Sequence, residues 1–268
     1  MSQCAIMYPP GRIVCLTEET VETLYLLGQQ ERIVGVSGYV VRPPEARRDK
    51  PRISSFLSAD LPKILALEPD LVLAFSDLQA EIVSGLIKAG VAVHAFNQRS
   101  VAEILDMVRL LGAMTGQGAQ SERLAQGFEA GLQAARDRAA ELPRRPKVYF
   151  EEWDEPMISG IAWVSELVEA AGGIDIFPEQ ARGKSAAERI VSREAVIAAA
   201  PDIIIASWCG KKARPEKIAA RPGFDSVPAV GMGQIFEIKS PIILQPGPAA
   251  LTDGLAALEA IIHRWSRL

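Results

Sequence analysis

The sequence predicts an α/β protein of two similar lobes, mainly because one helix-turn-strand segment occurs twice. Residues 64–74 read ILALEPDLVLA and residues 196–206 read VIAAAPDIIIA, with the Pro-Asp pair and the aliphatic run in the same places. In each copy a helix is expected to end before the proline, which cannot continue it. The aliphatic run then suits a strand buried on both faces. One copy lies in each half of the chain, which favours two lobes; one continuous sheet carrying both copies is the alternative.

Composition and charge exclude several classes of protein. The chain has 268 residues, of which 49% are hydrophobic, so it can bury a large core. Its net charge of -4 argues against a nucleic-acid partner. No apolar stretch is long enough to cross a bilayer, and three scattered cysteines do not make a disulfide framework. The first residues lack the pattern of a secretory signal, so as written we expect a cytoplasmic protein, and a monomer.

The first lobe is expected to span residues 1–100 as an alternation of strands and helices. Strands are predicted at residues 12–16, 33–37 and 91–96, and a helix at residues 21–27. With the first copy of the repeat between them, these elements make a Rossmann-like lobe.

The next stretch, residues 101–142, is almost wholly helical in pattern, with a break at residues 116–118. We expect it to act as a single long backbone helix joining the lobes, with a ligand cleft between them. The second lobe is expected to span residues 143–268, with a helix at residues 163–171 and a terminal helix at residues 249–265.

Four aromatic residues are candidates for contact with a ligand. Ligands of such folds meet the loops at the carboxyl ends of the strands. Tyr39, Phe56, Trp153 and Trp208 are all expected on such loops. Their flat faces suit a planar ring. Each such ring contact stabilises binding by roughly 0.5 to 1.5 kcal/mol beyond the contribution of the buried area. Each could instead fill the core edge of its own lobe.

Two polar features are expected beside these aromatics. The segment Glu151 to Glu155 is predicted to be an acidic loop, and Glu152 is its candidate binding residue. Its carboxylates could accept hydrogen bonds from a polar ligand or bind a cation, or could form a solvated rim. Gln245, on the last loop before the terminal helix, can donate and accept hydrogen bonds, or can simply belong to a turn.

Metal binding by the protein itself and catalysis have little support. The two histidines, His94 in a predicted strand and His263 in the terminal helix, cannot assemble a site of several histidines. We therefore predict no metal and no cofactor. The sequence contains no nucleophile elbow, phosphate loop or histidine-centred triad, so we predict no enzyme. An enzyme acting on a tetrapyrrole is conceivable only by analogy of fold.

Residues 12–17, 33–39 and 191–194, with Pro43-Pro44 and the two Pro-Asp strands, resemble the substrate-binding proteins of ABC importers for vitamin B12, haem and iron-siderophores. The vitamin B12-binding members match best, and the resemblance spans nearly the whole chain. It implies two lobes bridged by one long helix, and a cobalamin-like ligand first, with haem or a ferric siderophore next. Tyr39 and Phe56 match positions that contact the ligand in the B12-binding relatives. Such proteins are periplasmic or lipid-anchored.

The resemblance also implies docking on transporter permease subunits through one acidic residue in each lobe. Glu194 matches the second-lobe residue. The first-lobe position holds Pro62, and Asp60 is the nearest acid. A cytoplasmic carrier or sensor on the same fold is therefore a further alternative.

Overall fold

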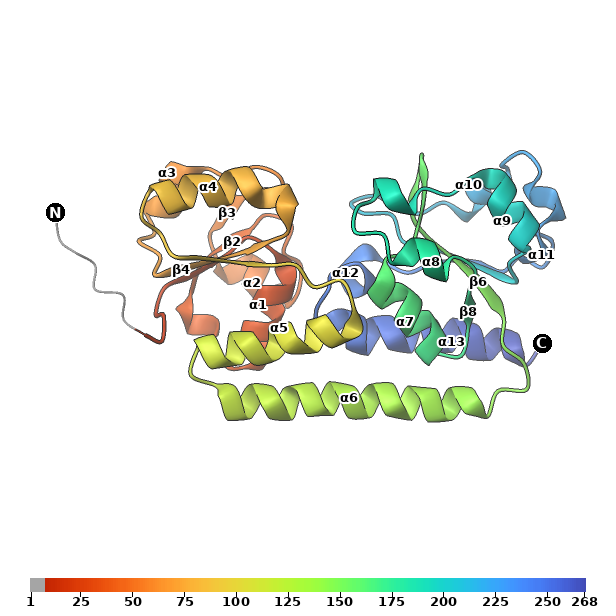
Figure 1. Ribbon diagram of the computed structural model, residues 1–268, viewed down its shortest axis with the longest axis horizontal. Coiled ribbons are helices and arrows are strands. Elements are labelled where there is room, and N and C mark those ends of the chain that lie inside the picture. Colours follow the sequence, from red (N-terminus) through yellow and green to blue (C-terminus); the bar gives the residue numbers. More distant parts are fainter. Residues whose placement is uncertain (1–7) are drawn as a thin grey trace. The chain divides into compact units, whose positions relative to one another are not determined.

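The computed structural model describes residues 8–268, and the chain divides into two compact units. Unit 1 consists of the chain up to Gln98 together with Glu103–Gln126, and unit 2 of Arg99–Ala102 together with Gly127–Leu268. Each unit is built on a five-stranded sheet covered by helices (Figure 1). The predicted α/β fold is confirmed.

The sheet of unit 1 has the strand order β3-β2-β1-β4-β5, and all its neighbouring strands are parallel. The strands are β1 (Ile13–Cys15), β2 (Ile33–Ser37), β3 (Arg52–Ser54), β4 (Leu71–Phe75) and β5 (Val93–Phe96). The α-helices are α1 (Glu18–Leu26), α2 (Pro44–Asp49), α3 (Leu61–Leu65), α4 (Ala80–Lys88) and α5 (Val101–Met114), and 3₁₀ turns cover Gln30–Arg32 and Asp77–Gln79.

The core of unit 1 lies on both faces of this sheet. On one face Ile82 and Leu86 of α4 pack on Val14 and Val72. Successive strand residues point to opposite faces, so Leu73, between Val72 and Ala74, faces the side where Figure 1 shows α1 and α5. This double burial explains why the strands read as continuous aliphatic runs.

The sheet of unit 2 has the order β10-β9-β6-β7, and β8 also pairs with β6. The strands are β6 (Lys147–Asp154), β7 (Met157–Ser159), β8 (Ile174–Asp175), β9 (Ile203–Ala206) and β10 (Ile235–Glu237). The α-helices are α7 (Ala162–Ala170), α8 (Pro178–Ala181), α9 (Arg193–Ala199), α10 (Pro215–Ala219), α11 (Pro228–Gly231), α12 (Ser240–Ile243) and α13 (Leu255–Ser266). 3₁₀ turns cover Ala187–Arg189 and Phe224–Ser226, and a π-helical turn covers Ala250–Gly254. The β6–β7 hairpin is antiparallel, whereas β6 pairs in parallel with β8 and β9, as β9 does with β10.

The stretch between the predicted lobes consists of two helices, α5 and α6 (Gly118–Ala140). The break predicted at residues 116–118 separates them. Gly116 there has a φ of 75°, a left-handed conformation that glycine adopts without strain. The residues of α6 are shared by both units, because the boundary falls after Gln126.

The repeat forms the same helix-turn-strand structure in both units, as α3 and β4 and as α9 and β9. The backbone N–H of Asp70 donates to Arg12 O at 2.8 Å, and the N–H of Arg12 donates to Asp70 Oδ2 at 2.8 Å. Asp202 and Lys147 make the same two bonds, also at 2.8 Å. We call each reciprocal pair a Pro-Asp clamp, because it fixes the turn to the start of the neighbouring strand.

The helix ends before these clamps also match. The residue preceding the proline is left-handed in both copies, with a φ of 45° at Glu68 and 48° at Ala200. Arg12 donates from Nε and Nη2 to Leu67 O, and Lys147 Nζ donates to Ala199 O at 3.3 Å. A basic side chain thus binds a carbonyl at the negative end of each helix.

Candidate functional site

Exposed apolar side chains gather on the loops that follow the strands of unit 1. Tyr39 follows β2, Leu57 follows β3 and Leu78 follows β4, and they are 62%, 66% and 56% exposed. Phe56, beside Leu57, is half-buried. Because the strands are parallel, the loops after them lie at one edge of the sheet. We call these four residues the apolar loop face of unit 1; it includes Tyr39 and Phe56, which were predicted from the sequence.

A buried glutamine connects three backbone segments beside this face. Gln79 is fully buried, and its Oε1 accepts a hydrogen bond of 3.0 Å from the N–H of Phe75. Its Nε2 donates to Phe56 O at 3.0 Å and to Leu16 O at 3.4 Å. One neutral amide therefore connects the ends of β1 and β4 to the loop after β3. Gln79 was not among the residues predicted from the sequence, although its place four residues after a buried strand was an available signal.

Two buried carboxyl groups lie at the start of α1, directly after β1. Glu18 accepts a hydrogen bond of 2.6 Å from the N–H of Val41, and Glu19 accepts one of 2.6 Å from the hydroxyl of Thr17. Burial raises the pKa of each carboxyl to about 7. Both carboxyl groups therefore change charge near neutral pH. They lie at the end of β1, on the side of unit 1 where the loops after the strands are found.

In unit 2, the acidic segment predicted as a loop belongs to a hairpin, which corrects the prediction. β6 continues to Asp154 because it pairs with β7, with a register shift between Glu151 and Trp153. Glu151, predicted on an acidic loop that could meet a ligand, bind a cation or form a solvated rim, is completely buried. The acidic composition of the segment pointed to solvent, whereas the hairpin depends on pairing with β7, which follows closely along the chain.

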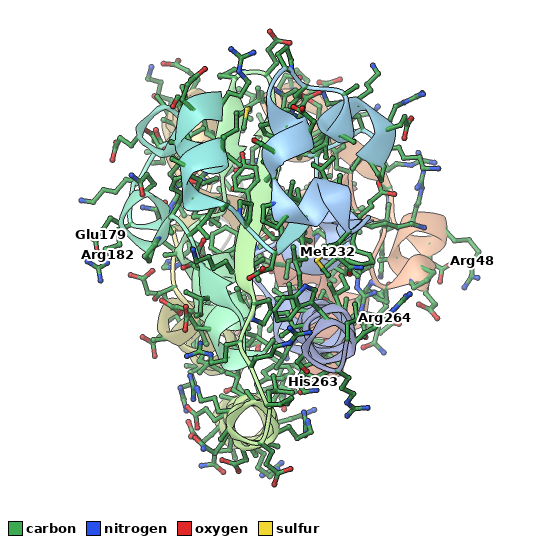
Figure 2. All side chains as sticks on the ribbon, turned by 90° about the vertical axis from the view of Figure 1, so that its right-hand side faces the viewer. Arg48, Glu179, Arg182, Met232, His263 and Arg264 are labelled. Carbon is green, nitrogen blue, oxygen red and sulfur yellow. The ribbon has the colours of Figure 1, made fainter. Side chains whose placement is uncertain are left out.

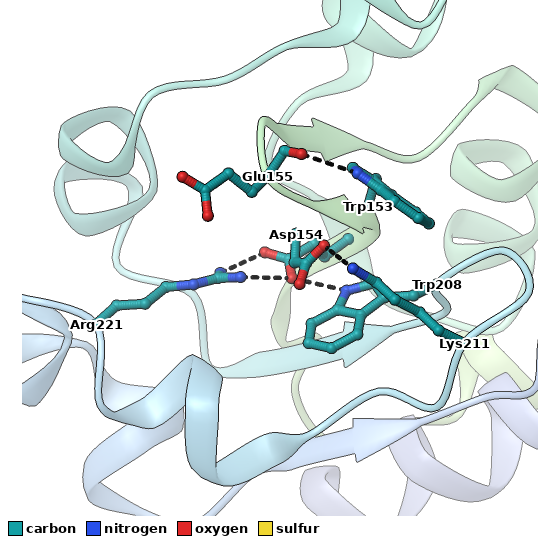
Figure 3. A network of polar contacts seen from close by, with 7 residues as sticks. Trp153, Asp154, Glu155, Trp208, Lys211 and Arg221 are labelled. Carbon is teal, nitrogen blue, oxygen red and sulfur yellow. Dashed lines mark hydrogen bonds and ion pairs between the residues drawn. The ribbon is translucent and has the colours of Figure 1, made fainter.

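Glu151 is buried together with the cation of Arg221 and the indole of Trp208, which are both labelled in Figure 3. Arg221 Nη1 lies 2.5 Å from Glu151 Oε2, and Nη2 lies 2.9 Å from Oε1. The indole Nε1 of Trp208 donates to the same Oε1 at 3.0 Å. Trp208 is only 4% exposed and packs in a core with Tyr149 and Phe224. Its body is part of the core, and its role as a ligand contact stays a prediction.

The side chain of a lysine lies over the rings of both predicted tryptophans. Lys211 Nζ lies 4.0 Å from the ring centroid of Trp153 and 5.1 Å from that of Trp208. The same atom lies 2.5 Å from Asp154 Oδ1. Trp153 is half-buried, and its Nε1 donates to Glu155 O at 2.9 Å. Figure 3 shows these side chains converging. Sequence reasoning missed Lys211, although it lies three residues after Trp208.

The other predicted acid of this hairpin is also paired. Glu152 binds the guanidinium of Arg189 through both carboxylate oxygens, with Nη2 2.9 Å from Oε1. Arg189 is 3% exposed and donates to Ser159 O as well. Glu152 is thus a partner of a buried arginine, and ligand binding by it remains a prediction.

Gln245 lies between α12 and the π-helical turn and is half-buried. Among the hydrogen bonds of residues 8–268, only its backbone oxygen takes part, accepting from Gly247 N at 2.8 Å. Its side-chain amide therefore has both a donor and an acceptor to offer.

The predicted docking acids differ in their surroundings. Glu194 lies in the first turn of α9, exposed, 3.1 Å from Nη2 of Arg193. Asp60 caps α3 as Ser192 caps α9, each accepting a hydrogen bond of 3.1 Å from the N–H three residues later. Pro62 is therefore the structural counterpart of Glu194, and Asp60 has a local role as a helix cap.

Of two hollows in the surface of unit 2, the smaller is lined by a candidate residue and the larger is not. A hollow of about 430 Å³ lies beside Trp208 and Lys211 and is also lined by Lys239. A larger one, of about 590 Å³, is formed by α6, α7 and α8 and contains none of the predicted residues. At its rim Arg182 pairs with Glu179 at 2.8 Å, and both extend from the surface (Figure 2). Size alone therefore does not mark the candidate site.

The described part of the chain, residues 8–268, has no helix with the length and apolar content needed to cross a membrane. Over the same residues, no group of three or more His, Cys, Asp or Glu side chains is arranged to hold a metal ion.

Comparison with known proteins gives consistent matches over most of the chain. A family model described as periplasmic binding protein matches residues 13–242. The vitamin B12-binding protein of Vibrio cholerae is 27% identical over 204 residues, which cover 75% of this chain and 71% of that protein. The cobalamin-binding protein of Halobacterium salinarum is 23% identical over 260 residues, covering 95% of this chain and 70% of that protein. The solved structure of the periplasmic haem-binding protein RhuT from Roseiflexus sp. RS-1, in apo form, has a TM-score of 0.79 and 27% identity, covering 94% of this chain and 98% of that one.

Proposed function

This chain belongs to the periplasmic binding protein family, and from that premise we propose that it binds a cobalamin-like corrinoid. It is a substrate-binding protein of the ABC-importer type, in a family of solute-binding proteins that are not enzymes. The choice of a corrinoid is supported by the two relatives named for vitamin B12 or cobalamin.

The observation that carries the proposal is the apolar loop face of unit 1. Tyr39, Leu57 and Leu78 are all more than half exposed. Each Å² of apolar surface removed from water contributes about 25 cal/mol, so covering these side chains favours binding of a large ring with apolar faces. Gln79 bonds the backbone of Phe56, beside Leu57, and of Phe75, shortly before Leu78, so little ordering of these two loops has to accompany binding.

The polar groups at the edge of a corrinoid need hydrogen-bond partners, and unit 2 has side chains that can provide them. The side-chain amide of Gln245 suits the amide groups that a corrin carries. Trp153 and Trp208 would add ring contacts, and Glu152 a carboxylate if it exchanged its arginine partner. The cleft predicted from the sequence, with a ligand in contact with both loop regions, stays part of this proposal.

The test is equilibrium binding of cyanocobalamin by calorimetry, with haem and a ferric siderophore as comparators. We expect Tyr39→Ala and Leu57→Ala each to raise Kd about tenfold, which corresponds to about 1.4 kcal/mol. Leu26→Ala is the matched control, because Leu26 is 46% exposed on α1, outside the loop face. Its Kd should equal that of the unmodified chain.

Haem is the second candidate ligand, favoured by the likeness to the haem-binding protein at 27% identity. Haem binding that depends on Tyr39 and Leu57, without cyanocobalamin binding, would replace the corrinoid. If Leu26→Ala weakened binding as much as Tyr39→Ala and Leu57→Ala do, the loop face would no longer be supported as the binding surface.

Delivery to a transporter is proposed at a coarser level. Permease subunits are the expected partners, and Glu194 is the exposed acid for their contact. Asp60 is engaged as a cap of α3, so we expect Glu194→Gln to weaken transport more than Asp60→Asn does. The cytoplasmic carrier or sensor, and the monomeric state, remain predictions that cell fractionation and sedimentation would check.

A further inference from the structure

The feature that goes beyond the proposed function is the space occupied by the ammonium group of Lys211. Three groups surround it: the ring of Trp153 at 4.0 Å, the ring of Trp208 at 5.1 Å and Asp154 Oδ1 at 2.5 Å. Two aromatic faces with one carboxylate form the type of cage that binds alkylammonium ions in other proteins. We call Trp153, Asp154 and Trp208 the indole cage.

The indole cage is fixed independently of its occupant. The Nε1 of Trp153 donates to Glu155 O at 2.9 Å, and the Nε1 of Trp208 donates to Glu151 Oε1 at 3.0 Å. Glu151 is in turn held by Arg221 through both oxygens. Both ring orientations are therefore set by bonds at the ring edges, which leaves the π faces toward Lys211 for a cation.

The occupant, in contrast, is a partly exposed side chain on a loop. Lys211 follows Gly210, which has a φ of 74°, in the connection between β9 and α10. The lysine side chain is 41% exposed, whereas that of Asp154 is 23% exposed. A lysine on a flexible stem can move its ammonium into water without disturbing the two rings.

We propose that the indole cage is a binding site for an alkylammonium group, protonated or quaternary, of a ligand that displaces Lys211. Lys211 acts as an internal competitor that fills the cage when such a ligand is absent. The competition makes the site selective, because a neutral group gains nothing from the rings and carboxylate that would offset removal of the lysine.

The experiment follows the indole N–H signals of the full chain by NMR during titration with tetramethylammonium chloride, at ionic strength held constant with sodium chloride. The chain has four tryptophans, so Trp163 and Trp265 serve as internal references outside the cage. In Lys211→Ala the signals of Trp153 and Trp208 should shift, with a Kd at least about tenfold lower than in the unmodified chain. Lys212→Ala, the neighbouring exposed lysine, is the matched control and should bind as the unmodified chain does.

Two further arms decide between a cation site and a general apolar hollow. tert-Butanol, a neutral molecule of similar size, should leave the signals unchanged. Adding Asp154→Asn to Lys211→Ala should weaken binding of tetramethylammonium, and a thermal melt checks that each variant is folded. The proposal is overturned if Lys211→Ala shows no shift, if tert-butanol acts equally, or if Lys212→Ala gives the same gain.

This inference does not need the corrinoid to be right. Cyanocobalamin and haem carry no alkylammonium group, so their binding and that of tetramethylammonium are separate measurements. A chain that binds tetramethylammonium in Lys211→Ala but neither ring compound would retain the cage and discard the corrinoid.

Discussion

The loop regions of the two units present opposite chemistry on similar scaffolds. In unit 1, Tyr39, Leu57 and Leu78 are exposed, and a neutral amide, Gln79, fixes the backbone beside Leu57 and before Leu78. In unit 2, the tryptophans are covered by Lys211, and a buried ion pair, Glu151 with Arg221, fixes the position of Trp208. One region offers surface that is already free, while the other must exchange an internal partner.

The difference teaches how the two regions can divide the work of recognition. Apolar contact is nondirectional, so the face in unit 1 contributes affinity to any ligand of suitable shape. Replacing one partner of an ion pair by a ligand of the same charge changes the binding free energy little. A ligand that leaves a charge of the protein unpaired is penalised. We therefore expect unit 1 to set the strength of binding and unit 2 to set its selectivity.

The largest effect on stability should come from breaking the buried ion pair of unit 2, Glu151 with Arg221. Arg221→Ala leaves the fully buried Glu151 carboxylate without its cation, which should lower the free energy of unfolding by about 3 to 5 kcal/mol. Urea denaturation measures the loss. Arg221→Met combined with Glu151→Gln is the matched control and should recover most of it, because no unpaired charge stays buried. A loss below about 1 kcal/mol in the single variant would show that the pair is not the support of this region.

The amide under unit 1 should give a smaller loss. Gln79→Ala removes the partners of Phe75 N, Phe56 O and Leu16 O, and we expect the free energy of unfolding to fall by about 2 to 3 kcal/mol. The fall should be insensitive to salt, because no charge is involved. Gln126→Ala, which loses one exposed hydrogen bond to Glu122, is the control and should change stability by less than about 0.5 kcal/mol. Equal losses in the two variants would contradict the scaffold role of Gln79.

The buried acids add a pH dependence to unit 1. Burial raises the pKa of Glu19 from 4.5 to about 7, so between these values the folded protein holds a proton that the unfolded chain has released. Stability is therefore greatest below pH 4.5 for this group, falls as the pH rises, and is level above about 7. Glu19→Gln removes the fall, and we expect it to stabilise the protein by about 1 to 3 kcal/mol at pH 8 and not at pH 4. Denaturation at both pH values measures this, with the exposed Glu31→Gln as control; a gain of the same size at pH 4 would refute the assignment.

The smallest effect should be that of emptying the indole cage. Lys211 and Asp154 are both partly exposed, so solvent screens their attraction, and Lys211→Ala should cost less than about 1 kcal/mol of stability. A thermal melt beside Lys212→Ala makes the comparison. A loss as large as that of Arg221→Ala would mean that Lys211 is a structural member of unit 2 and would remove the contrast between the two cations.

The fold followed from the sequence because its signals are local and periodic. The two Pro-Asp segments and the break near Gly116 each have the predicted structure. The site was harder to predict, since its contacts join distant residues. Arg221 meets Glu151 from 70 positions along the chain, and Gln79 reaches Leu16 from 63. The pattern around Glu151 indicated only its charge, and burial depended on a hairpin and an arginine that composition does not reveal.

The Pro-Asp clamps have a consequence for the order in which the protein folds. The bond from Arg12 to Asp70 closes a loop of 58 residues, and the bond from Lys147 to Asp202 closes one of 55. Because the entropy of closure varies only with the logarithm of loop length, the two closures differ by less than about 0.1 kcal/mol. A difference in folding rate between the units would therefore report on the helices and side chains that fill each loop, and not on the search that brings its ends together.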